Sequence, residues 1–134
     1  MALRLAGGPG GENKVANQFV WVDIPVTDLD RAVAFYSAVL SGPVTTQGFE
    51  GMSFALLPGG EGDVTGCLFV GEKMLPGALG PLIYLNCDGR LDEAGAAVVP
   101  AGGQILEEKH EIGPHGFRTV ILDSEGNRLA LHSR

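Results

Sequence analysis

The fold is decided first by residues 24–36, which read IPVTDLDRAVAFY. The first of these residues end an apolar, β-branched segment that spans residues 19–26, and such a segment is typical of a strand. Thr27 or Asp28 can cap a helix, and apolar side chains then recur at helical spacing. These residues therefore predict a strand that leads directly into an amphipathic helix, which Gly42-Pro43 ends.

Three short apolar segments follow this helix, and each has the length of a strand. They span residues 44–47, 52–57 and 64–70, and they are separated by Gly48 and by the Pro-Gly-Gly sequence of residues 58–60. The first half of the chain therefore predicts the element order β-α-β-β-β.

The second half repeats this order. Residues 81–88 match the character of the first strand, residues 91–99 predict a weaker helix, and an offset of 62 residues aligns residues 29–32 with 91–94. Further strands are expected at residues 104–106, 108–112, 117–122 and 128–132. We predict a duplicated α+β domain over residues 18–134, with module one at about 18–72 and module two at about 80–134, after a flexible glycine-rich lead-in at residues 1–17.

Composition excludes several classes of partner. The 134 residues suit one domain, and a formal net charge of −7 argues against binding to nucleic acids or anionic membranes and favours a neutral or cationic partner. Cys67 and Cys87 lie in apolar strand-like segments, so we expect both to be reduced and buried. Without a membrane-length apolar stretch or a signal sequence, the expected compartment is the cytoplasm.

Three motifs together carry a resemblance to a known family. They are residues 24–36, the Ala-Gly-Gly of residues 101–103, and LDSEGNRL at residues 122–129. In this order the sequence resembles the vicinal oxygen chelate superfamily of glyoxalases, bleomycin-resistance proteins and extradiol dioxygenases. The resemblance implies two βαβββ modules that form a curled, barrel-like mixed sheet around an open cleft. It also implies a homodimer, the commonest closed assembly.

Metal-dependent members of that superfamily bind a divalent ion through His or Glu on the first and last strands of each module. On this sequence, three of those ligand positions fall on Trp21, near Leu82 and on Ala130. In the fourth strand neither Cys67 and Phe69 nor Leu68 and Val70 offers a hard ligand. We therefore expect no metal and no other cofactor, with a shifted metal site at Asp23, Asn86 and His132 as an open alternative.

Strand alternation places other side chains in the expected cleft. Residues two positions apart share a face, so Asp23, Tyr84, Asn86 and His132 should point into the cleft together with Trp21. These five are our candidate ligand-binding residues, for a small organic molecule that is aromatic or cationic. The alternative is structural: the aromatic rings belong to the core and the polar groups bind one another near a solvated rim.

Two functions follow from this set. The first is a metal-free protein that binds or sequesters a small molecule; the second is an enzyme of the same fold, lyase, isomerase or dioxygenase-like, that uses Asp23 and His132. The catalytic residues of such an enzyme are not predicted. The segment KHEIGPHGF at residues 109–117 is not a metalloprotease helix, because Gly113-Pro114 breaks it, and we expect a loop over one end of the cleft.

Overall fold

The structure is a computed structural model that describes residues 17–134. Residues 1–16, and with them almost all of the expected lead-in, lie outside the described residues. The elements follow one another in this order: β1 (Trp21–Pro25), α1 (Leu29–Leu40), β2 (Thr45–Phe49), β3 (Met52–Leu56), β4 (Thr65–Phe69), β5 (Ile83–Asn86), α2 (Leu91–Val98), β6 (Gln104–Glu111), a 3₁₀ turn (Gly113–His115), β7 (Phe117–Leu122) and β8 (Arg128–Ser133).

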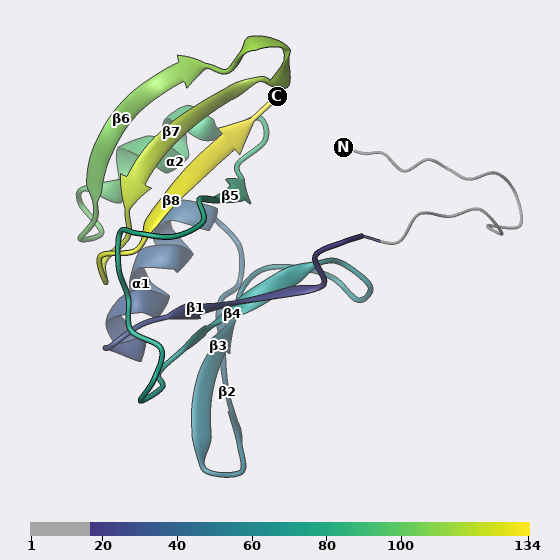
Figure 1. Cartoon of the computed structure of the whole chain (residues 1–134), viewed down its shortest axis with the longest axis vertical. Helices are drawn as coiled ribbons and strands as arrows, with labels where there is room; N and C mark the ends of the chain where they lie inside the picture. The colour runs from purple at the N-terminus through teal and green to yellow at the C-terminus, as the bar shows by residue number, and fades with distance from the viewer. Residues whose placement is uncertain (1–16) are drawn as a thin grey trace, which may run out of the picture.

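The strands form two mixed sheets of four, one from each module. Their orders are β1-β4-β3-β2 and β5-β8-β7-β6, and in each sheet the first strand of the module runs parallel to the last. Figure 1 shows the two sheets diverging from each other rather than closing into a barrel. The predicted α+β fold of two βαβββ modules is confirmed.

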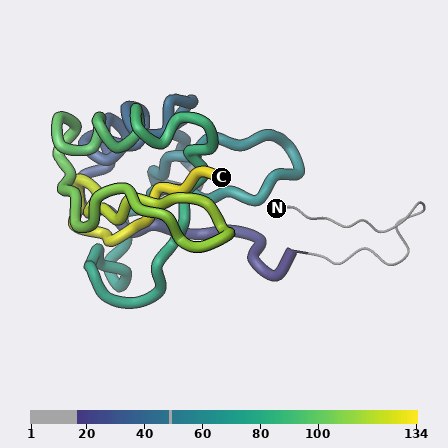
Figure 2. The backbone as a smooth tube through the Cα atoms, turned by 90° about the horizontal axis from the view of Figure 1, so that it is seen from above, coloured from purple at the N-terminus to yellow at the C-terminus, as the bar shows by residue number. Residues whose placement is uncertain are grey.

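Both helices lie on the same side of the molecule. Figure 2 shows α1 and α2 side by side, while the linker between the modules passes on the opposite side of the sheets. Phe35 and Tyr36 of α1 are fully buried and pack with Ile24 of β1, Leu68 of β4 and Leu131 of β8. One apolar core therefore joins the two modules beneath the helices.

The ends of α1 follow from its sequence. Of the two candidate caps, Asp28 is the N-cap, since its side chain accepts a hydrogen bond from the backbone N–H of Arg31. At the other end Ser41 adopts a left-handed conformation, with φ of 55°, immediately before Gly42-Pro43. The cysteines are also as expected, because Cys67 and Cys87 are buried free thiols.

Two boundaries differ from the sequence prediction. The strands expected at residues 104–106 and 108–112 are a single strand, β6, whose pairing with β7 shifts register on both sides of Glu107. Such bulges interrupt the alternation of side chains, which made one strand read as two. Gly48 does not separate strands but lies inside β2, and the turn falls at Glu50–Gly51, where both residues have positive φ.

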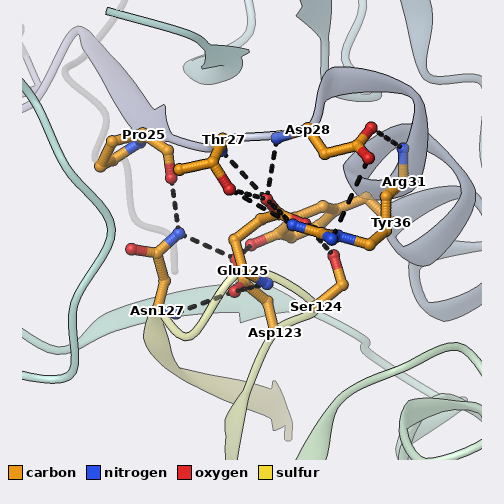
Figure 3. A network of polar contacts seen from close by, with 9 residues as sticks. All are labelled: Pro25, Thr27, Asp28, Arg31, Tyr36, Asp123, Ser124, Glu125 and Asn127. Carbon is orange, nitrogen blue, oxygen red and sulfur yellow. Dashed lines mark hydrogen bonds and ion pairs between the residues drawn. The ribbon is translucent and has the colours of Figure 1, made fainter. Parts of the chain in front are cut away.

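The DSEGN turn between β7 and β8 binds the junction between β1 and α1 (Figure 3). The side chain of Glu125 accepts hydrogen bonds from the backbone N–H groups of Thr27 and Asp28, each at 3.0 Å. It also pairs with the guanidinium of Arg31, whose Nε lies 2.7 Å from Oε2. A carboxylate from module two thus satisfies the N–H groups where the first helix of module one begins.

Two neighbours of Glu125 complete this connection. The buried Tyr36 hydroxyl donates to Asp123, and Asn127 donates to the backbone oxygen of Pro25 at 2.8 Å. Two of the three motifs that carry the resemblance, residues 24–36 and 122–129, are therefore bonded to each other across about a hundred residues. No helix in residues 17–134 is long and apolar enough to span a membrane.

Candidate functional site

Each sheet has one face packed on the helices and one that turns away from them. In the first sheet Ile24, Ala55 and Leu68 point into the core with α1, so alternation places Trp21 and Asp23 on the other side. We call that side the first open face. The sequence did not show which side chains of β4 share this face. The strand register shows that they are Cys67 and Phe69, and not Leu68.

Three side chains of the first open face are bonded together. The Trp21 indole Nε1 donates to Asp23 Oδ1 at 3.0 Å, and Cys67 Sγ lies 3.3 Å from the same oxygen. Burial raises the pKa of the Cys67 thiol to about 11, with a further contribution from Asp23. Cys67 therefore remains a neutral thiol that donates to the carboxylate, and it is not a nucleophilic thiolate at neutral pH.

The second open face is the side of the other sheet that turns away from α2. On it Tyr84 lies beside Ala130, and Asn86 lies beside His132, as the parallel register of β5 and β8 requires. The predicted sharing of a face by Tyr84, Asn86 and His132 is present in the structure. Arg118 of β7 joins them, because its register partner on β8 is His132.

Arg118 is the centre of a polar cluster on this face. Its Nη1 donates to the Tyr84 hydroxyl at 2.5 Å, and its Nε donates to His110 Nε2 at 3.0 Å. Glu107 Oε1 lies 3.7 Å from Arg118 Nη2 and 3.7 Å from His110 Nε2. We call these four residues the Arg118 cluster; three strands contribute to it.

Asn86 and His132 are each engaged locally. Asn86 Oδ1 accepts from the backbone N–H of Asp88, which stabilises the turn after β5. His132 Nε2 lies 2.7 Å from the carbonyl oxygen of His115, and its ring meets that of Tyr84 edge on, with centroids 6.1 Å apart. The expected loop at residues 109–117 thus contains a 3₁₀ turn that contacts His132, after the end of β6.

The five predicted site residues fall into two groups. Trp21 and Asp23 lie on the first open face, and Tyr84, Asn86 and His132 lie on the second. Within residues 17–134 no hydrogen bond, ion pair or ring contact joins the two groups. Two shallow hollows, of about 230 and 190 Å³, flank α2 and are lined by none of the five.

The residues at the superfamily's ligand positions do not fit a divalent metal. Trp21 offers an indole, Ala130 a methyl group and Leu82 an isobutyl group, and none of these donates an electron pair to a cation. On β4 only the protonated thiol of Cys67 carries a donor atom besides the hydroxyl of Thr65, which donates to Pro58. Among the described residues no three His, Cys, Asp or Glu side chains are grouped to hold an ion.

Sequence comparison finds similar proteins among bleomycin-resistance proteins and glyoxylases. The family model described as "Bleomycin resistance protein-like N-terminal" matches residues 18–42. The putative glyoxylase CFP32 of Mycobacterium bovis is 30% identical over 111 residues, which are 80% of this chain and 40% of the relative. The chain thus spans about 40% of the length of that relative, and the protein of the same name from Mycobacterium tuberculosis matches equally.

Solved structures show the same fold over most of the chain. A glyoxalase/bleomycin resistance protein from Albidiferax ferrireducens has a TM-score of 0.68 at 19% identity and covers 88% of this chain and 99% of that one. The genomically encoded fosfomycin resistance protein FosX from Listeria monocytogenes has a TM-score of 0.65 at 16% identity, covering 90% and 93%. In sequence and in fold this chain is therefore similar to glyoxalases and bleomycin-resistance proteins. The resemblance that its motifs predicted is confirmed.

Sequence reasoning did not identify Glu107 or Arg118, and it placed His110 in a loop, whereas the structure places His110 in β6. The bulges of β6 hide which side Glu107 and His110 take. A signal for Arg118 was available, because it is the only charged residue in the strand that residues 117–122 form. A lone cation within such a strand points to the open side of the sheet.

Proposed function

We propose that this chain binds a small organic molecule against its open faces, in a cleft without the usual metal ligands of the superfamily. The observation that carries the proposal is the exposure of two aromatic rings beside polar groups. Trp21 is 44% exposed and Tyr84 is 45% exposed, on strands whose other sides pack against the core. Exposed rings that are held by a hydrogen bond offer flat surfaces on which a ligand ring can stack.

Asp23 gives the first open face a hydrogen-bond acceptor for a ligand. Its Oδ1 accepts from Trp21 and Cys67, whereas its Oδ2 takes part in no hydrogen bond within residues 17–134. The second oxygen is therefore able to accept from an amine or another donor on a ligand that stacks on the indole. This supports the expectation of an aromatic or cationic ligand.

The names of related proteins favour small molecules as ligands. The structural relatives include a bleomycin resistance protein and a fosfomycin resistance protein, and both names refer to small organic compounds. A binding role also needs no metal, which agrees with the side chains at the ligand positions.

Fluorescence of Trp21 tests the proposal directly, because it is the only tryptophan of the chain. We expect some members of a library of small aromatic and cationic compounds to quench or shift its emission. Asp23→Asn should weaken the binding of the cationic compounds by about threefold or more, as expected for the loss of a charge-assisted hydrogen bond. Asp30→Asn, which removes the same charge from the exposed side of α1, should leave that binding unchanged.

The proposal is wrong if no compound alters the emission and if calorimetry detects no binding with the same library. It is also wrong in its placement if Trp21→Phe leaves every affinity intact. Circular dichroism of each variant separates a lost site from a lost fold.

The alternative function is an enzyme in which Asp23 and His132 exchange protons with the ligand. These residues lie on different open faces, and His132 Nε2 is engaged with the His115 carbonyl. No specific observation favours this alternative over binding, and it stays a prediction. Turnover of any binding compound, followed by mass spectrometry and lost in both Asp23→Asn and His132→Gln, would support it.

A further inference from the structure

We infer that the Arg118 cluster is an oxyanion site, in which Arg118 and Tyr84 bind a carboxylate or phosphonate group of a small ligand. This inference rests on the proposed binding function and names the chemistry that the second open face selects. It assigns to that face a charge preference opposite to that of Asp23 on the first open face.

Arg118 is fixed in place but retains free donors. Its side chain is 24% exposed, and two of its five N–H groups are used, by His110 and Tyr84. The remaining N–H groups meet no hydrogen-bond acceptor within residues 17–134. A guanidinium held by its neighbours and still able to donate is well suited to bind a planar oxyanion.

His110 holds Arg118 without neutralising its charge. His110 Nδ1 lies 2.8 Å from the backbone oxygen of Glu108, and a carbonyl oxygen can only accept a hydrogen bond. The proton of the imidazole is therefore on Nδ1, and the lone pair of Nε2 accepts the hydrogen bond from Arg118 Nε. Because this tautomer is neutral, the positive charge of Arg118 remains available to a ligand.

Tyr84 contributes a second donor next to Arg118. Its oxygen accepts from Arg118 Nη1, so its own hydroxyl proton points elsewhere and is free to be donated. No acceptor for that proton lies within residues 17–134. A ligand oxygen that reaches Arg118 Nη1 is thus also within reach of a phenol donor, and the ring of Tyr84 lies beneath the ligand.

Glu107 is the only acid in the cluster, and its pairing is loose. The 3.7 Å separation from Arg118 Nη2 exceeds hydrogen-bond length, and the carboxylate side chain is 53% exposed. A ligand oxyanion that bonds directly to the guanidinium would displace this weaker contact. Removing the charge of Glu107 should therefore strengthen anion binding, whereas removing that of Arg118 should abolish it.

Calorimetric titration with benzoate, phenylphosphonate and the neutral isostere benzamide tests the site on the full chain. We expect the wild-type protein to prefer the two anions over benzamide. Arg118→Gln should lower the affinity for benzoate by about tenfold or more, the usual effect of losing a charge-assisted hydrogen bond. Arg118→Lys should recover only part of the loss, and Tyr84→Phe should weaken benzoate by a smaller factor.

Three further variants separate binding at the site from general effects of charge. Arg134→Gln removes the same charge from an ion pair with Asp88, and it should leave the preference for benzoate unchanged. Glu107→Gln should raise the affinity for benzoate. Glu72→Gln, which removes the same charge from the exposed linker between β4 and β5, should not change it.

Each outcome then has a distinct meaning. If benzamide and cationic compounds bind but anions bind no better, the oxyanion site is wrong and the proposed function stands. An anion preference that survives Arg118→Gln in a folded protein also overturns the site. If no probe of any charge binds, both the site and the proposed function fail.

Discussion

Within residues 17–134, Glu125 makes more hydrogen bonds between the two modules than any other side chain. Its side chain is completely buried against Arg31, and its two oxygens accept from Thr27, Asp28, Arg31 and Ser124. Burial alone would raise the pKa of Glu125, but the hydrogen bonds from Arg31, Thr27, Asp28 and Ser124 outweigh it and hold the pKa at about 2. Glu125 therefore remains ionised across the physiological range.

This lowered pKa predicts a pH-dependent contribution to stability. A carboxyl that titrates at about 2 in the folded chain, against 4.5 ordinarily, stabilises the fold above pH 4.5 and loses that contribution as pH falls towards 2. Glu125→Gln should lower the free energy of unfolding at pH 7 by about 2 kcal/mol, as measured by urea denaturation. The difference between variant and wild type should shrink between pH 4.5 and 2. A difference that stays constant over that range, or an equal loss in Glu72→Gln, would contradict this role.

At the scale of secondary-structure elements, one glycine allows β1 to pair with β4. Gly66 is buried opposite Val22, and a Cβ at this position would collide with the carbonyl oxygen of Val22. Alanine would therefore push apart the two strands that carry Trp21 and Cys67 on the first open face. Gly95, in the middle of α2, has open space around its Cα, and there alanine removes only backbone freedom.

The same substitution should consequently have opposite effects at the two sites. We predict that Gly66→Ala lowers the free energy of unfolding by about 1–3 kcal/mol through overpacking. Gly95→Ala should raise it by about 0.5–1 kcal/mol, because glycine disfavours the helix interior. Chemical denaturation of both variants measures this directly. Stabilisation by Gly66→Ala would show that β1 and β4 are not paired as closely as described.

At the scale of the molecule, the two sheets of residues 17–134 leave four edge strands, and these edges are not equally protected against pairing with another chain. The edge strand β6 carries Glu107, Glu108, Lys109 and Glu111, and charged side chains discourage pairing with another chain. The edge strand β2, Thr45–Phe49, carries no charge. Apolar side chains are also exposed, with Phe19 and Val20 before β1 and Leu75 and Leu79 in the linker.

We propose that the chain covers this surface by forming a homodimer of two-fold symmetry. Light scattering coupled to size exclusion should give twice the chain mass of 14.0 kDa. Thr46→Lys, which places a charge in the unprotected edge strand β2, should shift the mass towards a monomer if that edge is covered. A wild-type mass of a single chain at the protein concentrations of the binding assays would contradict the proposal.

The order of the elements and most of their ends follow from local patterns in the amino-acid sequence. α1 and β7 lie where the pattern predicts, because a cap such as Asp28, a Gly-Pro stop and an apolar alternation act within a few neighbouring residues. The side of the strand on which Trp21 and Asp23 lie was predictable for the same reason. The resemblance to the superfamily followed from three short motifs, although the bonding of the first to the last through Glu125 did not.

Which of these side chains meet depends on how the strands pair in three dimensions. The bulges of β6 bring His110 to Arg118, and the register of β4 brings Cys67 to Asp23. The tertiary structure also separated the five predicted site residues into two groups on two sheets. The physical reason is that strand register is set by pairing between segments far apart in the chain, and a shift of one residue turns every side chain to the other face.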